Sequence, residues 1–270
     1  MKASKTSSGA VTGKLLNTLI LVALAAPGVA IAEEASPFSA NLGFTTDYIF
    51  RGISQTSGNP ALQGGIDYAH TSGLYAGIWG SNVSWIADSG AVATGSVTME
   101  LDTYFGFRNS FANDFTYDIG FIRYNYLGSY TENVAGGFAK ADTDEIYGAL
   151  GYKWITAKYS YGLGKFLTVP GAAGTNYIEV NASVPLGDTG ITFGAHAGKQ
   201  TYKGATADAL ALAGTSATYS DYKLSVSKDF SGYVIGLAYT DTNASPFYIY
   251  PAFGGDWAKG TAALSVTHAF

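Results

Sequence analysis

The chain has 270 residues and a formal net charge of −5, with 47% hydrophobic and only 13% charged residues, whereas soluble domains usually carry about 25% charged residues. So few charges cannot cover a water-facing surface, no apolar run beyond the N-terminal segment is long enough for a membrane-spanning helix, and the lack of cysteine excludes thiolate metal sites and cysteine nucleophiles. With 35 glycines and 20 tyrosines, this composition favours a barrel whose outer face contacts lipid.

The first 32 residues have the pattern of a secretory signal peptide. Three lysines accompany an apolar stretch at 15–26 that is too short to span a bilayer, and Ala30-Ile31-Ala32 forms a small-x-small cleavage site. Cleavage before Glu33 removes three of the 15 basic residues and none of the 20 acidic ones, which leaves 12 basic and 20 acidic residues and a formal charge of −8. That balance argues against nucleic acid as a partner. Residues 33–270 are predicted to form one outer-membrane β-barrel domain.

From Ser39 onward the sequence alternates apolar and polar residues in segments of about ten, the length that a tilted strand needs to cross an outer membrane. In one of them, Met99 and Leu101 share a face opposite Glu100 and Asp102. The pattern predicts an all-β fold, a twelve-stranded antiparallel up-and-down transmembrane barrel. The predicted strands are 39–50, 61–70, 74–83, 97–108, 115–126, 144–152, 155–163, 176–186, 191–200, 220–229, 233–241 and 260–270.

The connections between these segments alternate strictly between long and short. This is typical of outer-membrane barrels, in which periplasmic turns are tight and external loops are long. An even number of strands then leaves both termini in the periplasm. The short connections are 72–73, 109–114, 153–154, 187–190 and 231–232, and the long ones lie near 51–60, 84–96, 127–143, 164–175, 201–219 and 242–259.

Two of the short connections predict a strand register. A two-residue loop at 231–232 pairs Phe230 with Tyr233, so that Val226 faces Leu237 and Leu224 faces Tyr239. A four-residue loop at 187–190 pairs Leu186 with Ile191, so that Val184 meets Phe193 and Val180 meets Ala197. Both registers place apolar residues opposite apolar residues. The connection at 72–73 leaves the facing of Tyr75 and Trp79 open.

Aromatic residues collect near the ends of the predicted strands. They are interpreted either as the two aromatic girdles of a membrane barrel or as ordinary packing at strand ends. The predicted periplasmic set is Phe107, Phe111, Phe115, Trp154, Phe230, Tyr233 and Phe270, and the predicted outer set is Phe50, Tyr124, Tyr126, Tyr239 and Trp257. The last strand alternates up to Phe270, which resembles the signal read by the barrel-assembly machinery, with His268 as a departure from the usual pattern.

The first segments of the mature chain resemble a known family. The matching stretches are 44–55 (FTTDYIFRGISQ), 60–68 (PALQGGIDY), 73–83 (GLYAGIWGSNV) and 100–102 (ELD). Together they resemble the TorF-type porin family of proteobacteria, most strongly over about 40–130 and with a weaker similarity to the C-terminus. The resemblance implies an outer-membrane barrel and carries over no substrate and no catalytic residue.

The inward face of the predicted barrel holds the charged side chains. If the lumen is open, its acid-rich wall favours cations; alternatively, the charges pair with one another and fill the lumen, as Arg108 and Asp118 could do across one hairpin. The candidate lumen-lining residues are Asp47, Asp67, Glu100, Asp102, Arg108, Asp118, Glu145, Lys158, Glu179, His196 and Lys223.

Two further segments allow alternatives. In the stretch Asp47 to Gly52, Asp47 and Arg51 could line a constriction near the outer mouth, or Arg51-Gly52 could be a strand-end turn with Tyr48 and Phe50 at the membrane interface. The aromatic loop at 245–257 could stack a sugar or fold into the mouth as a lid, or it could rest on the rim. A short helix is expected within 203–217.

The sequence favours a passive channel for small hydrophilic solutes or ions over an enzyme. No G-x-S-x-G motif is present. The spacing of His70, His196 and His268 does not fit a metal site, and these histidines are expected to be solvated. Glu100 and Asp102 are interpreted as polar lining of the lumen rather than as a glycosidase pair. Neither a cofactor nor a metal is expected. The alternatives are a closed structural or adhesion barrel that presents its loops and, less favoured, an outer-membrane hydrolase. The expected partners are outer-membrane lipid, lipopolysaccharide, the assembly machinery and small solutes.

Overall fold

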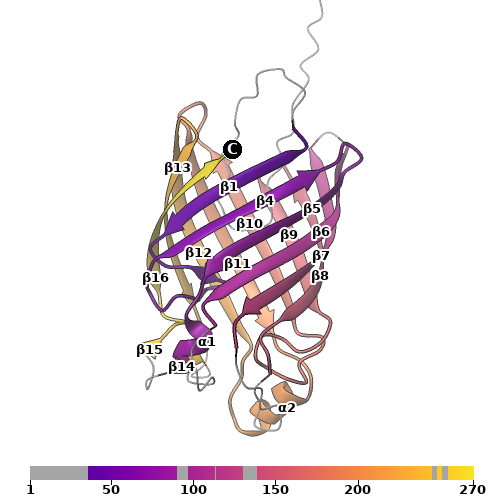
Figure 1. Ribbon diagram of the computed structural model, residues 1–270, viewed down its shortest axis with the longest axis vertical. Coiled ribbons are helices and arrows are strands. Elements are labelled where there is room, and N and C mark those ends of the chain that lie inside the picture. Colours follow the sequence, from indigo (N-terminus) through magenta and orange to yellow (C-terminus); the bar gives the residue numbers. More distant parts are fainter. Residues whose placement is uncertain (1–35, 90–96, 113, 130–138, 245–247, 251–254) are drawn as a thin grey trace, which may run out of the picture.

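The computed structural model describes residues 36–89, 97–112, 114–129, 139–244, 248–250 and 255–270. The predicted signal peptide, residues 1–32, lies outside them. Twelve strands form a closed antiparallel barrel, and β1 pairs with β16 to complete the ring (Figure 1). The barrel strands are β1 (Phe38–Thr45), β4 (Ala61–Ala69), β5 (Leu74–Asn82), β6 (Met99–Phe111), β7 (Phe115–Leu127), β8 (Thr143–Tyr152), β9 (Ile155–Gly162), β10 (Asn176–Pro185), β11 (Ile191–Thr201), β12 (Tyr219–Phe230), β13 (Tyr233–Thr242) and β16 (Thr261–Ala269).

The connections carry two small hairpins and two short helices. The hairpins are β2 (Ile49–Phe50) with β3 (Ile53–Ser54), and β14 (Ile249–Tyr250) with β15 (Gly255–Asp256); the helices are α1 (Trp85–Asp88) and α2 (Ala205–Leu212). The helix expected within 203–217 is therefore confirmed as α2. Neither helix of the described residues has the length and apolar character that crossing a bilayer requires.

Long and short connections gather at opposite ends of the barrel. We call these the loop end, which carries α1, α2 and both small hairpins, and the turn end, where β1 begins and β16 ends (Figure 1). The twelve predicted strands are confirmed, with two notable differences in their bounds. The first strand leaves the barrel after Thr45 instead of Phe50, and the fourth spans Met99–Phe111 because Phe111 still pairs with Phe115.

The predicted registers are confirmed. Phe230 pairs with Tyr233 and Val226 with Leu237, and Val184 pairs with Phe193. The facing that the sequence left open is set by the pairing of Ala69 with Tyr75. The His70 backbone still donates to the Leu74 carbonyl, so the register closes a three-residue loop at 71–73. Tyr75 and Trp79 therefore point into the barrel, where both are buried.

The outward residues form an apolar surface, because every second residue of each strand faces away from the lumen. Phe105, Ile119, Leu150 and Leu224 are each at least 60% exposed on this surface. The predicted aromatics at the turn end, such as Phe111, Trp154 and Tyr233, are likewise exposed. Such a surface fits contact with lipid rather than with water.

The predicted outer aromatic girdle is wrong for most of its members. Tyr124 and Tyr126 occupy inward positions of β7, Trp257 is buried, and Phe50 packs on Tyr124 inside the barrel, so that only Tyr239 faces outward. The reason is parity: Ile119 and Phe121 face outward on β7, and even-numbered residues of that strand must therefore face inward. The outward tyrosines toward the loop end are Tyr159, Tyr161, Tyr222 and Tyr239.

The packed core lies inside the barrel and near the loop end. Inward residues at that end, such as Ser81, Thr143 and Gln200, are almost fully buried. Inward residues at the turn end, such as Thr116 and Thr156, are exposed. The interior is therefore open to solvent from the turn end and filled near the loop end.

Candidate functional site

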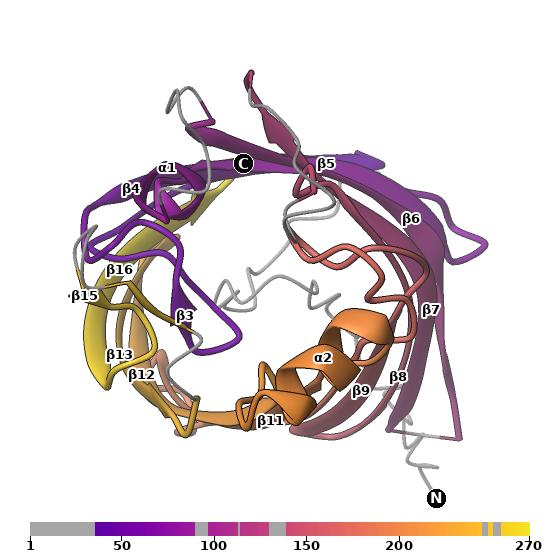
Figure 2. The ribbon, with the colours of Figure 1, turned by 90° about the horizontal axis from the view of Figure 1, so that it is seen from below.

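A hairpin from the first long connection fills the loop end of the lumen. We call residues 46–56, which include β2 and β3, the mouth hairpin; Figure 2 shows it inside the ring of strands. Its tip is Arg51-Gly52, with φ angles of 47° and 78° that fit the tight two-residue turn of a hairpin. A Cβ on Gly52 would lie 2.6 Å from the Cβ of Asp221 on β12, so the tip packs closely against the barrel wall.

The base of the mouth hairpin is held by Asp47. Its Oδ1 accepts hydrogen bonds from Ser54 Oγ at 2.6 Å and Thr56 Oγ1 at 3.0 Å, and Thr56 Oγ1 also accepts one from the Tyr48 backbone. Burial raises the pKa of the Asp47 carboxyl, and the hydrogen bonds from Ser54 and Thr56 oppose that shift. Asp47 was expected to line the lumen, and it instead closes the base of the hairpin.

Arg51 extends from the tip across the lumen. Its guanidinium donates two hydrogen bonds to Glu145 on β8, at 3.0 and 2.8 Å, and one to Gln200 Oε1 on β11, at 2.8 Å. It also lies 4.4 Å from the ring centre of Tyr177, a cation–π contact, and the Arg51 carbonyl accepts a hydrogen bond from Tyr219. Burial lowers the pKa of Arg51, but the charge and hydrogen bonds of Glu145, together with Tyr124 and Tyr177, more than offset this and leave the pKa above its ordinary value.

The two alternatives for Arg51 thus hold together. Arg51-Gly52 is a turn, as one alternative expected, and the Arg51 side chain points into the lumen toward Glu145 and Gln200, where the other alternative expected it. The expected interface positions of Tyr48 and Phe50 are wrong, because both lie inside the barrel, where Tyr48 packs edge-on against Trp79. The chain turns inward after Thr45, so the apolar residues that follow serve the internal core.

Part of the last long connection lies over the mouth hairpin. Tyr248 and Trp257 are buried in a cluster with Ile53 and Tyr219, and the Ser54 backbone donates to the Trp257 carbonyl at 2.9 Å. Residues 245–247 and 251–254 of the predicted aromatic loop lie outside the described residues. The described part packs into the mouth, as the lid alternative expects, and not on the rim.

Glu100 and Asp102 are the most deeply buried acids of the wall. They are 1% and 0% exposed. The hydroxyls of Tyr48 and Tyr126 lie beside Glu100, but none of the four carboxylate oxygens makes a hydrogen bond of normal distance and angle in the described structure. Burial, followed by the negative charges of Glu100 and Asp102, raises the pKa of Tyr48 in the mouth hairpin well above its ordinary value. The pair is thus a buried acidic centre without a basic partner, next to the mouth hairpin.

Most other inward acids are held by tyrosines, each lying across a glycine of a neighbouring strand. Tyr104 crosses Gly77 and donates to Asp67 at 2.6 Å, and Tyr177 crosses Gly198 and donates to Asp221 at 2.8 Å. Glycine is required there because the ring occupies the space of a Cβ.

The row from β5 to β8 uses the same arrangement twice. Tyr75 crosses Gly106 and Tyr147 crosses Gly120, their hydroxyls meet, and Tyr75 also donates to Asp118 at 2.7 Å.

The expected pairing of Arg108 with Asp118 is not what the structure shows. The two residues are register partners, but Arg108 lies over the Tyr75 ring at 4.7 Å and Asp118 accepts its hydrogen bond from Tyr75. Lys158 similarly lies over the Tyr147 ring at 4.3 Å. The lumen charges are therefore held by aromatic residues more than by each other.

His196 belongs to a polar network and is not solvated as expected. Its Nδ1 contacts Asn181 Oδ1 at 2.7 Å, and its Nε2 contacts Asp221 Oδ1 at 2.9 Å and Tyr177 Oη at 3.0 Å. Within the described chain, no three metal-binding side chains converge. Sequence reasoning missed Asp221, although it lies two residues before Lys223 and must share its face.

The remaining candidates all lie on inward positions of barrel strands. The wall formed by β13, β16 and β1 carries mainly small inward residues, among them Gly236, Ala263 and Gly43. The lumen is thus lined by charged and aromatic side chains on one side and by small ones on the other. The inward candidates are Asp67 on β4, Glu100, Asp102 and Arg108 on β6, Asp118 on β7, Glu145 on β8, Lys158 on β9, Glu179 on β10, His196 on β11 and Lys223 on β12.

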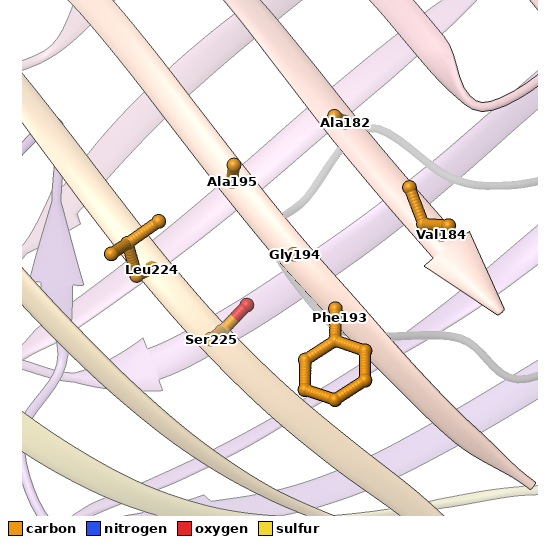
Figure 3. Close-up of a pocket in the computed structure, with 7 residues that line it drawn as sticks. All are labelled: Ala182, Val184, Phe193, Gly194, Ala195, Leu224 and Ser225. Carbon is orange, nitrogen blue, oxygen red and sulfur yellow. The ribbon is translucent and has the colours of Figure 1, made fainter. Parts of the chain in front are cut away.

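Two features outside the lumen have some of the attributes of a site. A shallow apolar groove on the outer surface, between Val184, Phe193 and Leu224, arises where Ala182 and Ala195 are small, and it is part of the outward apolar surface (Figure 3). At the turn end, His70 Nδ1 lies 2.8 Å from Ser72 Oγ. No described carboxylate orients this imidazole, and the contact fits a local turn better than a nucleophile–base pair.

Comparison with known proteins places the chain in a family. Among solved structures it is similar to the KdgM porin (9% identity, TM-score 0.49, covering 86% of this chain and 99% of that one) and the NanC porin (8%, 0.47, 86% and 98%). It is also similar to the outer membrane protein OprD from Pseudomonas aeruginosa (15%, 0.39, 88% and 66%). No curated protein matches it. A family model matches residues 30–270, and the chain therefore belongs to the family described as "bacterial protein of unknown function (Gcw_chp)".

Proposed function

We propose that this chain is a porin-like channel of the Gram-negative outer membrane, through which small hydrophilic solutes or ions diffuse passively. The observation that carries the proposal is the contrast between the two faces of one closed barrel. The outward face is apolar, as a surface in contact with lipid must be. The inward face carries charged and hydroxyl side chains, which suit a water-filled lumen better than an apolar core. The same contrast supports a location in a bilayer.

Two segments are expected to direct export and assembly of this protein. We expect residues 1–32 to act as an export signal that is removed, and the exposed C-terminal Phe270 to be read by the barrel-assembly machinery. Lipopolysaccharide would surround the loop end. The resemblance of residues 44–55 and 73–83 to TorF-type porins agrees with this assignment.

The mouth hairpin makes the proposed channel narrow. Solvent enters the lumen from the turn end, and Arg51 with Glu145 crosses it near the loop end. We therefore expect slow passage of small solutes and exclusion of large ones. Swelling of liposomes that contain the purified protein tests this: swelling in glycerol or arabinose but not in a trisaccharide supports the proposal, and swelling indistinguishable from protein-free liposomes contradicts it.

The balance of inward charge favours cations. Acids outnumber bases on the inward positions of the barrel strands, and Glu100 and Asp102 lie beside the constriction without a basic partner. We expect Glu100→Gln with Asp102→Asn to move the reversal potential in a salt gradient toward zero. As a control, Asp142→Asn with Asp144→Asn alters two acids that already pair with Lys140 and Arg123, and it should change the potential little. An unchanged potential in the first variant would contradict the acidic-lumen explanation.

The depth of burial in the mouth favours a second candidate, a closed barrel that acts through its external loops. Tyr48, Ile53 and Trp257 are each less than 10% exposed there, as residues of a protein core are. Such a barrel would neither swell liposomes nor conduct ions, even when fully folded.

A further inference from the structure

The buried carboxylates of Glu100 and Asp102 call for a positive partner. The two residues lie two positions apart on β6 and therefore share the inward face, and each is at most 1% exposed. A buried charge without a partner is strongly destabilising, and native proteins satisfy such groups with hydrogen bonds, ordered water or an ion. Glu145 lies close enough to Asp102 to repel it, and Arg51 is already engaged in a two-hydrogen-bond pair with Glu145.

The surroundings of the pair supply oxygen atoms but no cation. Glu100 pairs in register with Ser81 and Tyr126, and Asp102 with Trp79 and Tyr124. The Tyr48 hydroxyl from the mouth hairpin and the Tyr126 hydroxyl from β7 lie beside the Glu100 carboxylate, although neither makes a hydrogen bond of normal distance and angle with it. No described lysine or arginine forms an ion pair with either carboxylate.

Protonation alone would not satisfy these groups. A neutral carboxyl gains an O–H that must find an acceptor, and in the described structure no group makes a hydrogen bond of normal distance and angle with any of the four oxygens. A divalent cation would cancel both charges at once. All four carboxylate oxygens could coordinate the cation, and phenol oxygens could complete its coordination shell.

We propose that Glu100 and Asp102 form a binding site for a hard divalent cation of the Ca²⁺ type at the constriction of the barrel. Oxygen-only ligands suit Ca²⁺, which takes six to eight oxygens in irregular geometry and tolerates bidentate carboxylates, better than Zn²⁺, which prefers nitrogen and sulfur. The site needs no third acid, in keeping with the absence of a three-residue metal cluster from the described chain. Bound cation would also tie β6 to the mouth hairpin through Tyr48.

The site can be tested with Tb³⁺, which replaces Ca²⁺ and emits when a nearby aromatic residue is excited. Trp79 and Tyr126 flank the two carboxylates and serve as the donors. In the purified protein in detergent, we expect saturable Tb³⁺ emission that excess Ca²⁺ displaces. Emission should be lost in the isosteric variant Glu100→Gln with Asp102→Asn. It should be kept in the control Asp142→Asn with Asp144→Asn, because these two acids, also two positions apart, already form ion pairs with basic residues.

A second measurement distinguishes loss of cation binding from loss of folding in the variants. Each variant is checked for a heat-modifiable band on a gel, and urea unfolding is followed with and without Ca²⁺. Ca²⁺ should raise the unfolding midpoint of the wild-type protein and of Asp142→Asn with Asp144→Asn, but not that of Glu100→Gln with Asp102→Asn. Absence of Tb³⁺ binding to the folded wild-type barrel, or binding that survives Glu100→Gln with Asp102→Asn, would overturn the proposal. Because binding in detergent requires no pore, a barrel that binds Tb³⁺ but fails to conduct would refute the channel and leave the site standing.

Discussion

Replacing Arg51 with alanine should raise the single-channel conductance several-fold. The guanidinium is the group that ties the tip of the mouth hairpin to β8 and β11 on the far wall, through Glu145 and Gln200. Arg51 and Glu145 are only 7% and 1% exposed, and removing one partner of such a buried pair costs about 3–5 kcal/mol because it leaves the other charge unpaired. The hairpin would be released from that wall, and the Glu145 carboxylate would become hydrated.

The matched control for Arg51→Ala is Arg123→Ala. Arg123 also donates two hydrogen bonds to a carboxylate, that of Asp144, but it does so on the outer surface and is 42% exposed. Loss of that pair should cost about 0–1 kcal/mol and leave conductance unchanged. Conductance equal to wild type in Arg51→Ala would show that the mouth hairpin does not limit the passage.

The second large effect concerns stability and the glycines under the tyrosines. Gly106→Ala should lower the unfolding free energy by about 1–3 kcal/mol, the usual cost of overpacking. The new Cβ would lie 2.5 Å from Tyr75 Oη and 2.6 Å from the backbone carbonyl of Ile119. The hydroxyl can move only by losing its hydrogen bonds with Asp118 and Tyr147, and the carbonyl belongs to the paired strand.

Gly148→Ala provides the control for that substitution. Gly148 lies in β8, two strands away from Gly106 on β6, and a Cβ there would meet nothing within 4 Å. Alanine is favoured over glycine in a strand by about 0.5–1 kcal/mol, so this variant should unfold at the same or a slightly higher urea concentration. Equal midpoints for the two variants, measured in lipid vesicles, would contradict the role assigned to the tyrosine–glycine rows.

The strands and their registers could be predicted because each depends on information within one hairpin. Period-two alternation places Met99 and Glu100 on opposite faces, and the two-residue turn at 231–232 fixes the pairing of Phe230 with Tyr233. Asp221 and the inward tyrosines of β7 were also within reach, because their parity follows from neighbours on the same strand.

The mouth hairpin and the tyrosine–glycine rows could not be predicted in the same way. The apolar run from Tyr48 to Phe50 continues the pattern of the first strand, and nothing in the sequence marks that the chain turns inward after Thr45. The contacts of Arg51 with Glu145 and Gln200 join residues 94 and 149 positions apart. Tyr104 meets Gly77 and Asp67 only after three strands are in register.

Single-channel recording of the purified protein in a planar bilayer, under a salt gradient, tests the central claim most directly. A polar lumen narrowed by the mouth hairpin predicts discrete, small current steps with a reversal potential on the cation-selective side. A barrel that is folded by its heat-modifiable mobility, inserts into the bilayer and yet gives no current steps would contradict the claim and favour the closed, loop-presenting barrel.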